Sequence, residues 1–180
     1  MKNRIILLYA WFVRTALFIF PDVPLVSRFR GFLYGIAMKK CGPNLIVQHD
    51  AIIRDLQNLE FGRDIRIANH VAIWGSGKIV IEDCVIIGPH AVIVSGNHTL
   101  GNGSFRNGAG HKGVIILKEG SWVAANSTVC AGSVLPERSV LGANSMMNKA
   151  FTEQESIYGG VPARFIKNIE DKNDTNSRGL

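Results

Sequence analysis

Hydrophobic residues recur at every sixth position in the second half of the chain. The apolar positions are Leu117, Val123, Val129, Leu135, Leu141 and Met147, and a small residue follows four places after each of the first five, at Ser121, Ser127, Ser133, Ser139 and Ser145. Neither the 3.6-residue turn of a helix nor the simple alternation of a strand reproduces this spacing. The pattern predicts short, equal, straight segments that are separated by tight corners.

The same period extends upstream. The upstream apolar positions are Val47, Ile53, Phe61, Ile67, Ile73, Ile81, Ile87 and Ile93. Ile53 and Ile73 lie twenty residues apart, which is two steps of six and one of eight, so three sides complete one coil. Stacked coils pair the backbone N–H and C=O groups of one coil with those of the next. A β-sandwich would need turn signals every 8 to 12 residues and has no reason to hold a six-residue phase. We therefore expect an all-β, three-sided parallel solenoid.

The period is interrupted once, between Ile93 and Leu117. Residues 95–113 are rich in glycine and asparagine, and we expect them to leave the coil as an excursion loop. Insertions of this kind on a solenoid usually carry binding or catalysis. His98 stands near the start of the loop, where an imidazole with an ordinary pKa of about 6.5 can act as a general base. A solvated loop histidine without a catalytic role is the alternative.

Residues 1–40 form an apolar and basic segment that we expect to be helical. Its apolar run extends from Arg4 to Phe20, is broken by Arg14 and ends before Pro21. The run is too short for a membrane-spanning helix, which needs about 20 apolar residues, and it lacks the small-residue cleavage site of a secretory signal. Two interpretations stay open: a helix in the membrane interface with its basic residues toward lipid head groups, or a helix packed on the solenoid and its neighbours in an oligomer.

Charge and cysteine content narrow the class of protein. A formal net charge of +6 suits an anionic ligand or membrane, but nucleic acid is not an expected partner because no recognised nucleic-acid-binding motif accompanies the charge. Cys41, Cys84 and Cys130 have no metal-ligand spacing, which favours buried thiols in the reducing cytoplasm. The solenoid is expected over 41–150, and a C-terminal cap with a disordered polar tail over 151–180.

Five ordered motifs carry a resemblance to a known family. They are the hexads, Ser95-Gly96-Asn97-His98, the stretch 120–126, the stretch 141–145, and the closing segment 157–164. Together they resemble the hexapeptide-repeat acyltransferases over about residues 45 to 168. The likeness is greatest to the galactoside, maltose and nodulation-factor branch, and within it to the O-acetyltransferases of exopolysaccharide and colanic acid gene clusters. The resemblance implies that the solenoid is a left-handed parallel β-helix.

The resemblance also implies an activity and a site. The activity is transfer of an acetyl group from acetyl-CoA to a sugar hydroxyl, in a homotrimer whose active site lies in the groove between neighbouring prisms. His98 matches the catalytic histidine, and the positions matching the acetyl-CoA-binding residues are Trp122, Ala125, Ala143, Asn148, Lys149 and Arg164. Asn69, His70 and Asn97 are candidate acceptor contacts, although the sequence favours a surface or corner role for His70, and no metal is required.

Several alternatives and departures accompany this resemblance. Many relatives have proline after the catalytic histidine, and Thr99 stands here. The carboxylate that would orient His98 is not identified by the sequence, although Glu82 or Asp83 are candidates. The acceptor is either a lipid-linked intermediate or a soluble nucleotide sugar, so the protein is expected in the cytoplasm or peripherally on the inner face of the plasma membrane.

The sequence is also compatible with other functions. An amino-sugar N-acetyltransferase or a serine-type O-acetyltransferase would share the solenoid, although the long N-terminal helical domain of the serine enzymes is not seen. A non-catalytic solenoid is a further alternative. A zinc-dependent version would need His70, His90 and His98 to converge, whereas the spacing predicts only that His70 and His90 stack one coil apart.

Overall fold

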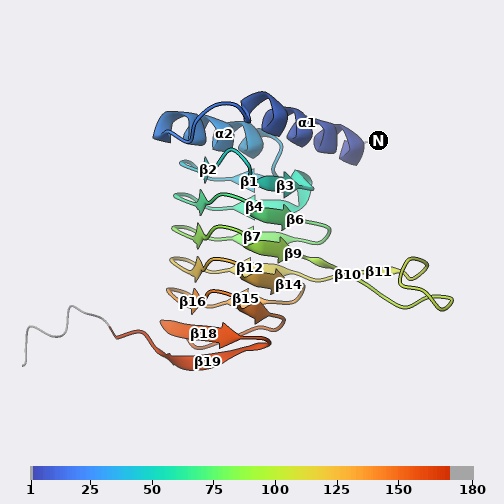
Figure 1. Cartoon of the computed structure of the whole chain (residues 1–180), viewed down its shortest axis with the longest axis vertical. Coiled ribbons are helices and arrows are strands. Elements are labelled where there is room, and N and C mark those ends of the chain that lie inside the picture. The colour runs from blue at the N-terminus through green and yellow to red at the C-terminus, as the bar shows by residue number, and fades with distance from the viewer. Residues whose placement is uncertain (1, 171–180) are drawn as a thin grey trace, which may run out of the picture.

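The structure is a computed structural model that describes residues 2–170. Coils stack along one axis to form a prism, with two helices across one end and a strand hairpin across the other (Figure 1). Pairing between successive coils is parallel, with Ile53 opposite Ile73 and Ile73 opposite Ile93. The predicted parallel solenoid is therefore confirmed. The tail expected to be disordered lies, from residue 171 onward, outside the described residues.

Three sheets form the faces of the prism. Face A contains β1 (Lys40–Cys41), β4 (Leu59–Phe61), β7 (Ile79–Ile81), β12 (Ile115–Leu117) and β15 (Val134–Leu135). Face B contains β2 (Ile46–Val47), β5 (Arg66–Ile67), β8 (Ile86–Ile87), β13 (Trp122–Val123) and β16 (Val140–Leu141). Face C contains β3 (Ile52–Arg54), β6 (Ala72–Trp74), β9 (Val92–Val94), β14 (Thr128–Cys130) and β17 (Met146–Met147). The chain runs from face A to B to C in each coil, so we name the corners AB, BC and CA.

The sixth-position residues fill the interior of the prism. Val47, Ile73, Ile87, Val123 and Leu141 have no exposed surface, and the other sixth positions are also buried. Removing these side chains from water is the main favourable contribution to the stability of such a column. The sixth-position residues therefore form the hydrophobic core of the prism.

The small residues of the hexads are buried as well, and most of their hydroxyls are hydrogen bonded. Ser127 Oγ donates to the Gly142 carbonyl at 2.7 Å, and Ser133 Oγ donates to the Met147 carbonyl at 2.9 Å. A serine is small enough for the corner and supplies a donor to the neighbouring coil. This second role explains why serine, rather than alanine, recurs there.

The corners require an unusual backbone conformation. At corner BC, His70, His90, Asn126 and Asn144 all have φ values between 56° and 63°, which is the left-handed region that asparagine tolerates better than most residues. Cys84 occupies an equivalent position at corner AB with φ 59° and is exposed. The expectation that all three thiols are buried is therefore wrong for Cys84, because its side chain points outward from a corner, while Cys41 and Cys130 are half-buried.

The excursion leaves the prism at corner CA. It contains the antiparallel hairpin of β10 (Gly96–His98) and β11 (Gly110–Lys112), which projects away from the coils (Figure 1). Its root is fixed to the prism, because Gly113 N donates to the Ser95 carbonyl at 2.9 Å and Gly77 N donates to Ser95 Oγ at 2.8 Å. A rigid scaffold thus presents the hairpin.

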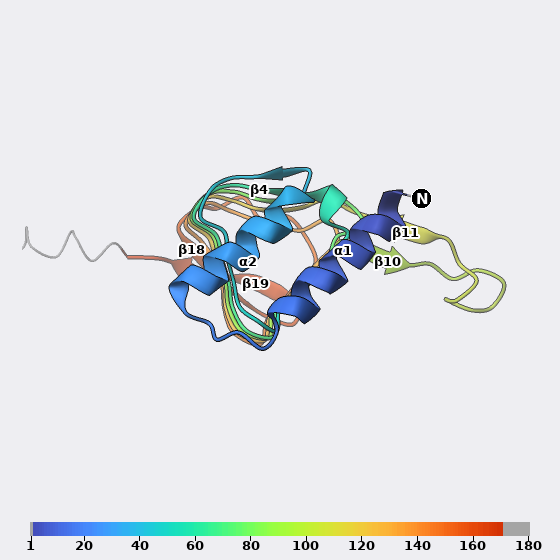
Figure 2. The same cartoon turned by 90° about the horizontal axis from the view of Figure 1, so that it is seen from above.

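Two helices cover the end of the prism at the first coil. They are α1 (Lys2–Leu17) and α2 (Pro24–Ile36), which lie side by side over the coils (Figure 2). The apolar run forms α1, which ends at Leu17, ahead of Pro21. Pro24 begins α2, and proline is favoured at the first position of a helix. Within the described residues, neither helix has the length and apolar character needed to cross a bilayer.

The opposite end is closed by the C-terminal strands. β18 (Ser156–Gly160) extends face B beside β16, and β19 (Ala163–Asn168) pairs with it antiparallel. Tyr158 is buried, stacks on Phe151 with ring centroids 4.1 Å apart, and donates its hydroxyl hydrogen to the Glu153 carbonyl at 2.6 Å.

The short 3-10 helix η1 (Leu56–Asn58) fills corner CA of the first coil.

Candidate active site

Small residues form a groove along corner BC in the fourth and fifth coils. Ala125 and Ala143 stand one coil apart, in a groove of about 390 Å³ that Pro89, His90, Asn126 and Asn144 also line. Asn126 Nδ2 donates to Asn144 Oδ1 at 3.0 Å, which fixes the outer edge of the groove. A larger side chain at either alanine would fill this space.

The backbone of this groove has unused donors. The Ala125 carbonyl accepts from Asn144 N at 3.0 Å, but the N–H groups of Ala125 and Ala143 donate to no other group within residues 2–170. A backbone N–H is a strong donor that is normally paired. Two such donors along a straight groove suit a ligand with successive carbonyl groups, as the pantetheine arm of coenzyme A has.

Face B carries an exposed tryptophan beside this corner. Trp122 precedes the buried Val123, points outward and has 45% of its surface exposed. It lies in register with Ile86, which is also 45% exposed, and with Val140. Arg164 lies on β19 at the end of the same face and is exposed. An outward indole with apolar neighbours is suited to a ligand or a second chain.

His98 lies at a different corner. It is the last residue of β10, is exposed, and its ring is not hydrogen bonded to another described residue. Asn97 precedes it and pairs with His111 across the hairpin. The imidazole is therefore accessible from solvent and is not held by another side chain of the described residues.

The two carboxylates considered as partners of His98 lie elsewhere. Glu82 and Asp83 follow β7 at corner AB. Glu82 accepts from Glu119 N at 3.0 Å, and Asp83 forms an ion pair with Arg63 at 2.9 Å. The pKa of Asp83 lies below its ordinary value, mainly because the carboxylate accepts a hydrogen bond from the Arg63 backbone N–H. Burial raises this pKa, and the hydrogen bond from the Arg63 guanidinium lowers it further. Neither residue is placed to orient His98 within one chain.

Asn148 and Lys149 lie at corner CA of the fifth coil, directly after β17, and both are exposed. Lys149 Nζ stands 5.3 Å from the centre of the Phe151 ring. This contact is worth about 0.5–1 kcal/mol at an exposed site and leaves the ammonium accessible. One face of the prism separates this pair from Ala125 and Ala143.

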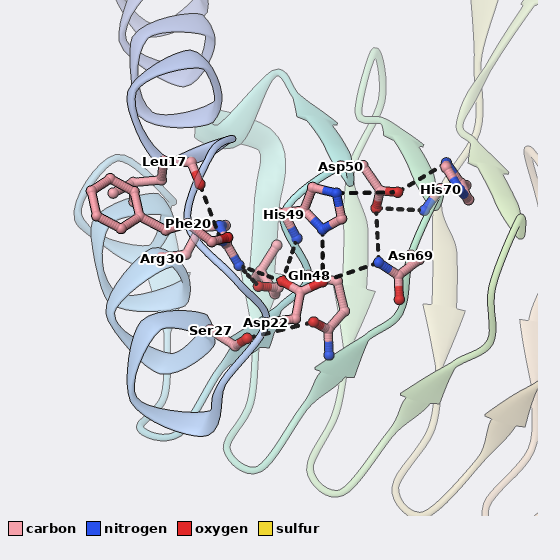
Figure 3. A network of polar contacts seen from close by, with 11 residues as sticks. Leu17, Phe20, Asp22, Ser27, Arg30, Gln48, His49, Asp50, Asn69 and His70 are labelled. Atoms are coloured by element: carbon pink, nitrogen blue, oxygen red, sulfur yellow. Dashed lines mark hydrogen bonds and ion pairs between the residues drawn. The ribbon is translucent and has the colours of Figure 1, made fainter.

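Asn69 and His70 belong to a polar network at corner BC that was not foreseen (Figure 3). Asp22, between the two helices, accepts from His49 Nδ1 at 2.7 Å, from Asn69 Nδ2 at 3.1 Å, and pairs with Arg30 at 3.1 Å. Burial alone would raise the pKa of Asp22, but the hydrogen bonds of His49 and Asn69 outweigh it, so the pKa lies below its ordinary value. The network fixes the helices to the first two coils.

A second carboxylate continues this network toward the third coil. Asp50 accepts from the backbone N–H of His70 at 2.8 Å and contacts His70 Nδ1 at 3.0 Å. The His70 ring stacks on that of His90, with centroids 4.5 Å apart, as the one-coil spacing predicts. His98 stands on the hairpin at corner CA instead, so the three histidines of the zinc-dependent alternative do not share one corner.

One chain therefore divides the predicted site residues among separate surfaces. Corner BC holds Asn69, His70, Ala125 and Ala143, face B holds Trp122 and Arg164, and corner CA holds Asn97, His98, Asn148 and Lys149. Sequence reasoning missed Asp22, although it is the only acidic residue before Asp50. A lone acid in a basic, apolar segment is a signal for a buried ion pair.

Relatives detected by sequence are acetyltransferases. No established protein-family model matches the chain. It is 24% identical over 131 residues to the galactoside O-acetyltransferase of Escherichia coli, which covers 73% of this chain and 64% of that protein. It is 25% identical over 158 residues to the putative colanic acid biosynthesis acetyltransferase WcaF of the same organism, covering 87% of this chain and 84% of that protein. The chain thus spans less than two thirds of the length of the galactoside enzyme.

Solved structures share the fold. The hexapeptide-repeat acetyltransferase VCA0836 of Vibrio cholerae, complexed with acetyl-CoA, superposes with a TM-score of 0.81 at 21% identity, covering 94% of this chain and 90% of that one. A galactoside acetyltransferase in complex with coenzyme A also gives 0.81, at 20% identity, covering 95% and 84%. The fold is therefore the left-handed parallel β-helix of the hexapeptide-repeat acetyltransferases. These matches confirm the resemblance noted in the sequence.

Proposed function

We propose that this protein is an acetyl-CoA-dependent O-acetyltransferase that acts on a sugar hydroxyl in surface polysaccharide assembly. The observation that carries the proposal is the groove at corner BC, where Ala125 and Ala143 leave two N–H donors free along a straight track. The resemblance to WcaF supports the polysaccharide role, since that relative is named for colanic acid biosynthesis. Acetyl-CoA is the cosubstrate.

The reaction needs one proton acceptor. The acceptor hydroxyl attacks the thioester carbonyl carbon as the His98 imidazole takes its proton. The tetrahedral intermediate then expels the CoA thiolate, which takes the proton back, so no covalent enzyme intermediate forms. General-base catalysis of this kind contributes about 10²–10⁴-fold, and holding the two substrates in line supplies much of the remainder.

A homotrimer would complete the site. His98 projects from corner CA, whereas Trp122 and the alanine groove lie on face B and at corner BC of the same prism. Packing three prisms around a common axis would carry the hairpin of one chain to the groove of the next. Asn148 and the cations of Lys149, Arg164 and Lys167 would then meet the nucleotide end and phosphates of acetyl-CoA.

The N-terminal helices support a peripheral location on a membrane. Among residues 1–20, Ile5, Leu8, Trp11, Phe12 and Ile19 are exposed, each by more than half of its surface. Arg4 is also exposed in this segment. A helix with apolar and basic surface fits the interface of an anionic bilayer, in keeping with a cytoplasmic enzyme on the inner face of the plasma membrane.

Acetyl transfer is tested directly with labelled acetyl-CoA. We expect label to appear on neutral saccharides or polysaccharide precursors, because the site has a base for a hydroxyl. The panel should include amino sugars and free serine, and mass spectrometry of the products identifies the modified atom. Label on nitrogen only would replace the proposed function by an N-acetyltransferase, and label on serine only by a serine-type enzyme. No label on any acceptor would reject the proposal.

The groove at corner BC predicts a specific binding defect. Ala143→Leu should raise the KM for acetyl-CoA by about tenfold, because its added methyl groups obstruct the track and block one donor, a loss comparable to one hydrogen bond to a ligand. Steady-state kinetics at fixed acceptor concentration measure the effect. Ala143→Ser keeps the small size and should retain the native KM. Equal KM values for the two variants would mean that acetyl-CoA does not bind in this groove.

A further inference from the structure

A second groove lies between α1 and face C in the first two coils. It has a volume of about 720 Å³, and its apolar lining includes Leu7, Leu8, Trp11, Ile52 and Trp74. We call it the α1–C groove. Three arginines, Arg4, Arg14 and Arg54, complete its lining. An apolar surface with three cations fits an amphiphile whose anionic group adjoins a hydrocarbon chain.

Within residues 2–170, no acidic side chain pairs with the arginines of the α1–C groove. None of its three arginines forms an ion pair with another residue in the part of the chain that the structure describes, whereas Arg30 nearby pairs with Asp22. Arg14 Nε is buried and has no hydrogen-bond partner among the described residues. A buried donor without a partner costs about 1–3 kcal/mol, so a ligand that accepts this bond would bind favourably.

The α1–C groove is on the same face as the root of the β10–β11 hairpin. Arg54, Trp74 and Val94 stand in register on the neighbouring strands β3, β6 and β9, and strands are about 4.8 Å apart. The hairpin begins at Gly96, two residues after Val94. The N-terminal end of α1 also points to the side of the prism from which the hairpin projects (Figures 1 and 2). A ligand held in the groove can thus extend toward His98.

We propose that the α1–C groove binds the phosphate and the adjoining hydrocarbon of a lipid-linked saccharide, with the saccharide extending toward His98. Guanidinium groups bind phosphate through paired hydrogen bonds, and the two indoles offer apolar contact to the chain. Acetyl-CoA is not expected in the α1–C groove, because the groove assigned to acetyl-CoA lies in the fourth and fifth coils. The saccharide part of this proposal rests on the proposed acetyltransferase function.

Binding to the groove can be measured without any reaction. Farnesyl phosphate serves as the probe below its aggregation threshold, and fluorescence of Trp11 and Trp74 reports its binding to the full chain. We expect saturable binding that weakens about tenfold in Arg54→Gln, the loss expected for one charged hydrogen bond. Arg66→Gln is the matched control, since Arg66 is also an exposed strand arginine, but in the next coil and on face B.

The controls separate the sources of affinity. Farnesol and inorganic phosphate should each bind at least tenfold more weakly than farnesyl phosphate, because each lacks half of the recognised group. Equal Kd values for Arg54→Gln and Arg66→Gln, or absence of binding, would overturn the proposal. A change of oligomeric mass in Arg54→Gln by light scattering would also overturn it, by showing that a second copy of the chain occupies the groove.

Kinetics then test the saccharide part. Arg54→Gln should raise the KM for a farnesyl-phosphate-linked sugar about tenfold more than the KM for the free sugar. If no sugar of either kind is acetylated while farnesyl phosphate still binds through Arg54, the acetyltransferase function fails and the lipid site stands. If both sugars are acetylated with the same change in KM, the lipid assignment fails and the function stands.

Discussion

His98→Ala should lower kcat for acetyl transfer by about 10²–10⁴-fold, the contribution of a general base. The side chain is exposed at the end of β10 and makes no hydrogen bond that its loss would break within the described residues. Folding and acetyl-CoA binding should therefore be preserved. Steady-state kinetics, calorimetry with CoA and light scattering measure the three properties separately.

His111→Ala is the matched control for this experiment. His111 is exposed on β11 and lies opposite Asn97, so it shares the hairpin with His98 but occupies the other strand. Its removal should leave kcat near the native value. Unchanged turnover in His98→Ala would remove His98 from the mechanism, and an equal loss in both variants would point to damage of the hairpin.

Asp22→Ala should lower the free energy of unfolding by about 3 kcal/mol, the lower end of the range for breaking a buried ion pair. Arg30 is 1% exposed and has Asp22 as its acidic partner, while its other contacts are carbonyl groups such as that of Val47 at 2.6 Å. Without the carboxylate, the buried guanidinium keeps its charge uncompensated. Urea unfolding followed by circular dichroism measures the change.

Glu155→Gln provides the comparison for an exposed pair. Glu155 accepts from Arg138 Nε at 2.7 Å, and both side chains are more than half exposed. Its loss should cost under about 1 kcal/mol, as surface ion pairs do. Similar losses for Asp22→Ala and Glu155→Gln would show that the network beneath the helices contributes little.

The same carboxylate predicts a pH dependence. Asp22 has a pKa below its ordinary value in the folded protein, so the unfolded chain binds more protons in mildly acidic solution. Its contribution is complete above the unfolded pKa of about 3.9 and is lost as the pH falls through the lower folded pKa. The native protein should therefore lose stability more steeply than Asp22→Asn over that acidic range.

Much of the fold follows from short-range sequence rules. Each hexad carries its own inward residue and its own corner residue, so the positions of Ile73 or Val123 are set within six residues of chain. The excursion is recognisable because it breaks that period. By contrast, the second helix and the Asp22 network depend on where the N-terminal segment meets the end of the prism, which no local pattern records.

The sequence predicts how single side chains of the candidate site point, but not how those residues are arranged relative to one another. The outward direction of Trp122 follows from the buried Val123 beside it. His98 and Ala143 lie at different corners of one prism. The hexad spacing alone does not tell which corner each residue occupies. Contacts between chains add a further level that hexad patterns do not specify, because those patterns report the interior of a single prism.

The hairpin interrupts the chain without interrupting the stack. β12 pairs with β7 in full register, Ile115 opposite Ile79, as though the excursion between them were missing. Lengthening, shortening or exchanging that arm therefore leaves the coils beneath it intact. Under the proposed function, evolution can in this way alter the arm that carries His98 while the groove at corner BC stays unchanged, and an engineer can graft a foreign arm at the same two anchor points.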